Sequence, residues 1–330
     1  MNTSYKIIFN SRCAERTPLV YSYGNTKDIR ISLAKNKAVV SFTMGVKKTI
    51  DDFARLKVNI FADAYRKVLL CHACKYGCNL QVEKITTCID DDEYELNEDN
   101  TDAFPLMYSM ISSDSFNISE AFGSGGFLNE IVSTTKSDAE TDLRFVSLYS
   151  YLQSKKRNYI IDRFSNLWTS MNAFYNYYYK MTEQYKKDPR PKDKAALDNI
   201  IKILGFGGCI SSQNEREQNK QFYHKMKDLL SGMKNDKELY DSAFSKRKDI
   251  RFEKLQECAG ELKMDLFPLL LFEFPYYLRC NYFHGNQCTI LISSYNDYEL
   301  RCLETVNYFL DRFLDERIPM LFAINEEAAK

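Results

Sequence analysis

The sequence contains very little histidine. Only three of its 330 residues are His, and no HExxH pair occurs, which argues against a His-rich catalytic metal site because imidazole is a preferred zinc ligand. The chain also has no GxSxG motif and no Walker-type phosphate loop. The sequence therefore does not indicate an α/β-hydrolase or a P-loop NTPase.

An excess of charge of one sign is also missing. The chain balances 45 basic residues with 45 acidic ones, so its bulk charge favours neither nucleic acid nor a membrane as a partner. No apolar run is long enough to cross a membrane, and the first residues, MNTSYKIIFNSRC, contain no apolar stretch of signal-peptide length. We expect a cytoplasmic protein without a membrane partner, whose ten cysteines are reduced thiols.

Residues 1–135 predict a region of mixed α and β structure. Short runs rich in β-branched and aromatic residues are separated by turn-forming residues. These runs are SYKIIFN, PLVYSY, DIRISLA and KAVVSFTM. A fifth run, CNLQVEKITTCI, has the alternation of residues that is typical of a strand. Residues 49–77 have helical spacing, with Asp51 and Asp52 suited to a first turn. The acidic tract DDDEYELNEDNTD is expected to be a solvated loop.

Residues 136–330 predict an all-helical domain, so the fold class is α+β overall. In the clearest helix, six residues lie on one stripe: Phe164, Leu167, Trp168, Met171, Tyr175 and Tyr178. The boundary near residue 135 follows the Gly-rich stretch FGSGGF. We expect this stretch to be a flexible connection, since it lacks the following Lys and Ser or Thr of a phosphate-binding loop.

The stretch CHACKYGC offers soft metal ligands at short spacing. Cys71, His72, Cys74 and Cys78, with Cys88 further on, could hold zinc through thiolate and imidazole groups. However, Cys71, Cys74 and Cys78 also have the spacing of small residues that line the core side of a helix. No second pair of ligands completes a zinc finger. The core interpretation is therefore preferred, and no cofactor is expected.

The most distinctive stretch is FPYYLRCNYFHGNQCTI, residues 274–290, which brings Arg279, Asn281 and His284 close together in the sequence. A histidine with a pKa near neutral can move the proton of a ribose 2′-hydroxyl or of a leaving oxygen. An arginine can stabilise the charge that develops on a phosphate. Arg279 and His284 therefore suit RNA cleavage. The surplus of Lys and Arg over residues 144–263 could hold a polyanion, although surface charge that only keeps helix ends and loops soluble is the commoner role of such residues.

A single helix does not easily direct both groups at one atom. If Pro275 begins a helix, Arg279 and His284 lie about 140° apart around its axis. They could converge if the helix frays at Gly285, or if a second copy of the helix supplies the missing group. The alternative is structural: Arg279 pairs with an acidic neighbour such as Glu273, and His284 caps the end of the helix.

Two segments of the chain resemble one protein family. YYLRCNYFHGN is similar to the terminal RxxxxH motif of HEPN domains, in particular the ApeA-like HEPN group. DRFSNLWTSMNAFYNYY is similar to an earlier helix of that group in its Phe, Leu-Trp and Asn-Ala-aromatic positions. These positions are Phe164, Leu167, Trp168, Asn172, Ala173 and Tyr175. The resemblance covers about residues 140–318, and its two motifs together are more specific than either alone.

The resemblance implies an all-α HEPN bundle that forms a homodimer through its RxxxxH helices. It implies a metal-independent endoribonuclease of bacterial toxin or antiphage systems, with RNA as substrate and an antitoxin or activator protein as a further partner. Arg279 would then stabilise the phosphate, His284 would act as general acid or base, and Asn281 would position RNA or the histidine.

Two further residues bear on this resemblance. Asn172 is expected to fix helix packing, with RNA contact as its second role. Cys280 departs from the small polar residue that follows the arginine in active members of the family. The alternative function is therefore a catalytically inactive HEPN scaffold that binds RNA, nucleotide or a partner protein.

Overall fold

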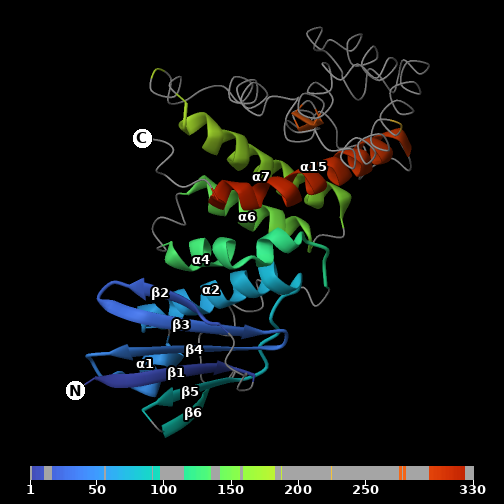
Figure 1. Ribbon diagram of the computed structural model, residues 1–330. Coiled ribbons are helices and arrows are strands. Elements are labelled where there is room, and N and C mark those ends of the chain that lie inside the picture. The colour runs from blue at the N-terminus through green and yellow to red at the C-terminus, as the bar shows by residue number, and fades with distance from the viewer. Residues whose placement is uncertain are drawn as a thin grey trace. The chain divides into compact units, whose positions relative to one another are not determined.

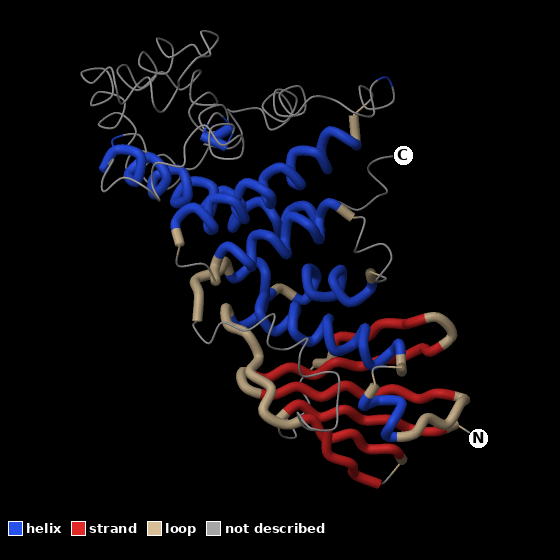
Figure 2. Tube along the Cα trace, turned by 180° about the vertical axis from the view of Figure 1, so that it is seen from behind, coloured by secondary structure: helices blue, strands red, loops and turns tan. Residues whose placement is uncertain are grey.

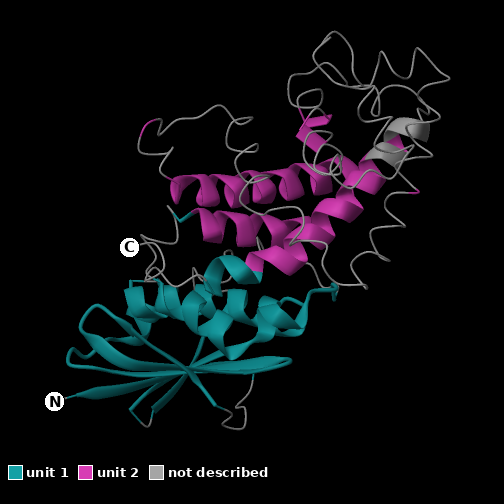
Figure 3. Cartoon of the chain, turned by 45° about the horizontal axis from the view of Figure 1, so that its top comes forward, with its two compact units in different colours: residues 1–142, 319–328, 330 teal, residues 143–318, 329 magenta. Residues whose placement is uncertain are grey.

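The computed structural model describes residues 2–10, 17–55, 57–90, 92–96, 115–134, 142–156, 159–182, 187, 224, 275–276, 278–279 and 297–323. The chain forms two compact units (Figure 3). The first contains residues 1–142, 319–328 and 330, and the second contains residues 143–318 and 329.

An antiparallel sheet of six strands forms the first unit (Figure 1). Its strands are β1 (Thr3–Phe9), β2 (Leu19–Tyr23), β3 (Thr26–Ala34), β4 (Lys37–Met44), β5 (Ile85–Ile89) and β6 (Asp92–Leu96). They lie in the order β2-β3-β4-β1-β5-β6. The mixed α and β content predicted for this region is confirmed, since each of the five β-rich runs forms a strand.

Strand β6 corrects the interpretation of the acidic tract. The tract was predicted to be a solvated loop, but part of it pairs with β5 in the register Thr87 with Tyr94 and Ile85 with Leu96. Leu96 is buried, and the other residues of β6 are exposed. An edge strand needs a partner on only one side and tolerates charged side chains in solvent, so the acidic composition did not prevent pairing.

One face of the sheet is covered by α1 (Ile50–Ala54) and α2 (Asn59–Tyr76) (Figure 2). The ring of Tyr5 in β1 lies 5.5 Å from that of Phe53 in α1, and the ring of Phe9 lies 5.4 Å from that of Tyr65 in α2. The predicted helix of residues 49–77 is therefore two helices. The carboxylate of Asp52 accepts the backbone N–H of Thr49 at 3.1 Å, and this hydrogen bond lowers the pKa of Asp52.

Helix α2 ends at Gly77, which adopts a left-handed φ of 59°. A Cβ at this position would lie 2.5 Å from the carbonyl oxygen of Phe116, so the chain can approach this closely only at glycine. The Gly-rich stretch beyond it was expected to be a flexible connection. It instead forms the short 3₁₀ helix η1 (Glu120–Gly123) and the start of α4 (Gly125–Ser133), where Ser124 Oγ accepts the N–H of Phe127.

The second unit contains α6 (Leu143–Ser154), α7 (Ile160–Lys180) and most of α15 (Asp297–Ala323). Five of the six residues of the stripe predicted for α7 are buried, and the last one, Tyr178, is half-buried near the end of the helix. Helices α6 and α7 approach closely at two serines, since the hydroxyl of Ser170 donates to the carbonyl oxygen of Ser147 at 2.7 Å. None of the helices in the described part of the chain is long and apolar enough to cross a membrane.

The last part of α15 belongs to the first unit, which begins again at Pro319. There the ring of Phe322 meets the ring of Phe127 in α4, with centroids 4.9 Å apart in an edge-to-face arrangement. Phe322 and Phe127 are both buried. The first unit therefore takes part of its core from residues far along the chain.

Candidate functional site

The two segments that suggested a function meet at one described contact in the second unit. The indole ring of Trp168 in α7 lies 6.2 Å from the ring of Tyr276, with an interplanar angle of 56°. Trp168 is also 6.4 Å from Tyr175, two turns further along its own helix. Spacing in the sequence placed Trp168 and Tyr175 on one helical stripe but did not predict the contact with Tyr276, which is more than 100 residues from Trp168.

Arg279 lies one turn beyond this ring contact. The residues described around it, Pro275, Tyr276, Leu278 and Arg279, are all helical. Pro275 and Leu278 are buried and anchor the turn, whereas Arg279 is half-buried. The planar guanidinium of arginine suits the oxygens of an anionic ligand. Asn281 and His284 lie outside the described residues, as does Glu273, so the convergence of Arg279 and His284 stays a prediction.

Trp168 carries a buried polar atom at this contact. Its side chain is 3% exposed, and its indole Nε1 has no hydrogen-bond partner among the residues that the structure describes. A buried donor without a partner costs free energy, and such atoms concentrate at functional positions. The indole therefore packs against the ring of Tyr276, and its N–H is buried without a partner among the described residues.

Asn172 lies one turn from Trp168 on α7 and is half-buried. The side-chain amide of Asn176 donates to the backbone carbonyl oxygen of Asn172 at 2.9 Å. It also donates to the side-chain oxygen, Oδ1, of Asn172. These hydrogen bonds stay within one helix, so the predicted role of Asn172 in fixing helix packing stays a prediction. They do fix the orientation of its amide group.

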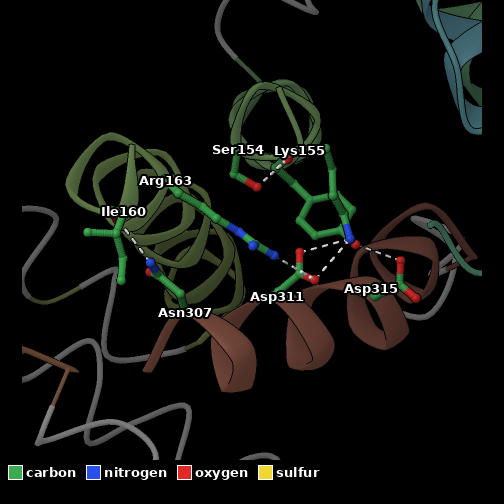
Figure 4. A network of polar contacts seen from close by, with 8 residues as sticks. Ser154, Lys155, Ile160, Arg163, Asn307, Asp311 and Asp315 are labelled. Atoms are coloured by element: carbon green, nitrogen blue, oxygen red, sulfur yellow. Dashed lines mark hydrogen bonds and ion pairs between the residues drawn. The ribbon is translucent and has the colours of Figure 1, made fainter. Parts of the chain in front are cut away.

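A network of charged residues joins α6, α7 and α15 (Figure 4). The ammonium group of Lys155 lies 2.8 Å from Oδ1 of Asp311 and 3.0 Å from Oδ2. The guanidinium of Arg163 lies 3.3 Å from Oδ2 of the same carboxylate. The Lys155 side chain is only 8% exposed, against 21% for Asp311. This ion pair is largely removed from water and holds the three helices in register.

The same network continues through Tyr151. Its hydroxyl donates to Oδ1 of Asp315 at 2.6 Å, and its ring is fully buried. Burial raises the pKa of Tyr151, and the carboxylates of Asp311 and Asp315 raise it further. Nearby, the side-chain amide of Asn307 donates to the carbonyl oxygen of Ile160 at 2.9 Å. This network was not predicted from the sequence. Its only signals were the four-residue spacing of Tyr151 with Lys155, just beyond the end of α6, and of Asp311 with Asp315 on α15.

Three of the four cysteines considered as zinc ligands are part of the hydrophobic core. Cys71 and Cys74 are buried on α2, Cys78 is half-buried just beyond the helix, and Cys88 is buried on β5. Burial raises the pKa of the Cys71 thiol to about 12 and raises that of Cys74 well above its usual value. Among the residues that the structure describes, no group of three His, Cys, Asp or Glu side chains is placed to hold a metal ion.

His72 contacts the backbone through both ring nitrogens. Its Nδ1 lies 3.1 Å from the carbonyl oxygen of Cys78, and its Nε2 lies 2.6 Å from that of Lys35 in the turn between β3 and β4. Burial lowers the pKa of His72, although these carbonyl oxygens oppose the effect. The imidazole therefore ties α2 to the sheet of the first unit.

Comparison with known proteins finds no match for this chain, whether among family models, curated proteins or solved structures. Its function must be inferred from its own residues, and Arg279 beside the Trp168–Tyr276 contact is the best-supported starting point.

Proposed function

We propose that the chain is a metal-independent endoribonuclease of the HEPN class that acts as a homodimer in bacterial toxin or antiphage defence. One observation carries the proposal, the ring contact between Trp168 and Tyr276. It brings together the two segments that resemble this family, which are far apart in the sequence. Two motifs that occur in the expected order and also touch support a shared function better than either motif alone.

In this proposal the all-α HEPN bundle lies within residues 136–330, and its described helices are α6, α7 and the part of α15 before Pro319. The network of Lys155, Asp311 and Arg163 supplies a rigid frame for the site. Residues 1–135 sense a trigger, restrain the nuclease or select its substrate.

The proposed reaction is transesterification within RNA. His284 removes the proton of a ribose 2′-hydroxyl, and the 2′-oxygen attacks the adjacent phosphorus. The bond from phosphorus to the 5′-oxygen breaks, and that oxygen takes up a proton. The products are a 2′,3′-cyclic phosphate and a 5′-hydroxyl. Arg279 stabilises the added negative charge on the phosphate, and Asn281 positions the RNA.

A second protomer solves the geometric problem posed by the motif. Because Arg279 and His284 diverge by about 140° on one helix, an arginine from one copy and a histidine from the other can face the same phosphate. We therefore propose that the RxxxxH helices of two protomers meet and that RNA binds across them. A monomer in solution that cleaves RNA at full rate would contradict this arrangement.

The deciding experiment incubates the purified chain and its Arg279→Ala and His284→Ala variants with total cellular RNA in EDTA, followed by a denaturing gel. We expect cleavage by the unaltered chain alone, with a 2′,3′-cyclic phosphate at the new ends. If the His284→Ala variant cleaves as well as the unaltered chain, the nuclease proposal is wrong. RNA binding without cleavage by any of the three proteins would favour the inactive scaffold.

A further inference from the structure

We infer that the side-chain amide of Asn172 binds a phosphate oxygen of the RNA substrate, and that Asn176 is the positioning residue that orients this amide. The inference rests on the proposed ribonuclease function and names a contact of that site beyond Arg279, Asn281 and His284. It starts from the pair of hydrogen bonds that Asn176 makes to Asn172.

The orientation of the Asn172 amide follows from what each atom can donate or accept. A side-chain amide has one oxygen that accepts and one nitrogen that donates two hydrogen bonds. The Nδ2 group of Asn176 donates to both the backbone oxygen and the Oδ1 of Asn172. If the Asn172 amide were turned around, two NH₂ groups would face each other at hydrogen-bond distance. Oδ1 therefore faces Asn176, and the Nδ2 of Asn172 is directed away from it.

No described residue accepts a hydrogen bond from this Nδ2 group, so its two N–H donors are left for another partner. Asn172 and Asn176 also lose little conformational entropy when they form this hydrogen bond, because residues four apart on a helix are already neighbours. The binding of an acceptor at Asn172 would therefore not have to order the side chain first, and less affinity is lost to side-chain entropy.

The position of Asn172 connects it to Arg279. It is four residues beyond Trp168, which corresponds to about 40° around the helix axis. Trp168 contacts Tyr276, and Arg279 follows Tyr276 by one helical turn. The Asn172 amide and the Arg279 guanidinium are thus each within one turn of the same ring contact. A substrate phosphate held near Arg279 would have its neighbouring backbone groups beside α7.

The surface of α7 around Asn172 suits an anionic chain. Polar residues spaced by three or four positions form one stripe, consisting of Ser165, Thr169, Asn172, Asn176 and Lys180. Thr169 and Lys180 are exposed, and the other three are half-buried. Residues 165–180 contain no Asp or Glu. Thr169 and Asn176 already donate within the helix, so the stripe offers a ligand mainly the Asn172 amide and the Lys180 ammonium. These groups favour the phosphodiester backbone, whose oxygens only accept.

The test measures RNA binding by the full-length chain carrying His284→Ala, so that the RNA stays intact. The probe is a fluorescently labelled single-stranded RNA of mixed sequence in EDTA, and the readout is its Kd. Asn172→Ala should weaken binding by about tenfold, as expected for the loss of a hydrogen bond to a charged group. Asn172→Asp preserves size but turns a carboxylate toward the phosphate, and it should weaken binding more.

Asn166 provides a matched control on the same helix. Its side-chain amide donates to the carbonyl oxygen of Asp162, four residues earlier, at 2.9 Å. This is the backbone hydrogen bond that Asn176 makes to Asn172, but without a second asparagine to orient. Asn166→Ala should leave the Kd for RNA unchanged. An equal loss in the Asn166 and Asn172 variants would overturn the inference.

The positioning role of Asn176 has a separate readout. Asn176→Ala should weaken RNA binding less than Asn172→Ala, because the freed amide still reaches the phosphate part of the time. Once Asn172 is already Ala, Asn176→Ala should have no further effect, since residues that act as one unit are not additive. Losses that multiply in the double variant would show that Asn176 does not act through Asn172.

The failure of this inference can be told apart from the failure of the proposed function. Cleavage in EDTA by the unaltered chain tests the function alone. If the chain cleaves RNA while the Asn172 variants bind it with unchanged affinity, the inference is wrong and the ribonuclease stands. If the His284→Ala chain binds no RNA and the unaltered chain cleaves none, both are wrong. Circular dichroism of every variant checks that the helices are retained.

Discussion

The hydroxyl of Tyr151 in α6 donates a hydrogen bond to the carboxylate of Asp315 in α15 at 2.6 Å. The two residues are 164 positions apart in the sequence. This hydrogen bond is short because its acceptor is a carboxylate, and its burial strengthens it. It fixes one end of the three-helix arrangement of α6, α7 and α15.

Replacement of Tyr151 by Phe should lower the free energy of unfolding of the second unit by about 2 kcal/mol, since it removes a buried donor to a carboxylate. Urea unfolding followed by circular dichroism measures the change. Tyr149 lies on the same helix and is 49% exposed, so Tyr149→Phe should change stability by less than about 0.5 kcal/mol. Equal effects of the two substitutions would contradict the contact.

The raised pKa of Tyr151 also predicts a dependence on alkaline pH. The folded protein keeps this phenol protonated above the usual pKa of 10.0, whereas the unfolded chain releases the proton there. The stabilisation is therefore complete below about pH 10 and is lost as pH rises further. Tyr151→Phe should reduce this loss, seen as a smaller fall in the urea midpoint between about pH 9 and pH 11.

Substitution of Asp311 by Asn should be strongly destabilising. It leaves the nearly buried ammonium of Lys155 without its carboxylate, and we expect a loss of about 2–3 kcal/mol, less than for a fully buried pair because Asp311 retains some exposure. The double variant Lys155→Met with Asp311→Leu should recover most of this loss, because an apolar pair leaves no unpaired charge. A double variant less stable than Asp311→Asn would refute this explanation. Thermal unfolding of both variants provides the measurement.

His72 should make the first unit sensitive to mild acid. Burial holds the pKa of His72 below its usual 6.5, so the unfolded chain binds a proton there that the folded chain does not. Stability is therefore full above about pH 6.5 and falls, by at most about 1.4 kcal/mol per pH unit, as pH drops toward the lowered pKa. His72→Gln should flatten this slope in urea unfolding. An equal slope in the His72→Gln variant and the unaltered chain would contradict this explanation.

Substitutions at Gly77 and Gly24 distinguish two costs of adding a Cβ, which are backbone strain and steric overlap. Both have left-handed φ angles, 59° and 55°. A Cβ at Gly24 would meet nothing within 4 Å, whereas one at Gly77 would lie 2.5 Å from the carbonyl oxygen of Phe116. Gly24→Ala should therefore cost about 1 kcal/mol of backbone strain, and Gly77→Ala should cost at least about 1 kcal/mol more because the backbone must move. Equal melting temperatures would contradict the close approach.

Local patterns in the sequence were sufficient to predict elements whose composition or spacing is distinctive. Strands β1 to β4 are short runs of β-branched and aromatic residues between turn-forming residues, and the α7 stripe has the period of a helix packed on one side. The prediction from the sequence failed at β6, because backbone pairing to β5 outweighs the low strand propensity of Asp92, Glu93 and Glu95. It also failed at α4, where Ser124 caps a helix that begins with two glycines.

The candidate site was predictable only in part, because its contacts join distant segments. Arg279 was recognised from its motif and Trp168 from the earlier helix, but their proximity depends on the packing of Tyr276. The orientation of Asn172 by Asn176 could have been suspected, since residues four apart face each other on a helix. The pairing of Tyr151 with Asp315 could not, because tertiary packing alone determines which carboxylate a buried hydroxyl meets.

The division of α15 between the two units affects how the protein can be made. The first unit consists of residues 1–142 together with residues 319–328, and Phe322 from the later part covers Phe127 from the earlier one. During synthesis the sheet emerges from the ribosome early, but its unit cannot be completed until residue 322 has followed. A fragment that ends at residue 142 would leave the buried ring of Phe127 open to water, so this unit is best expressed with its returning segment attached.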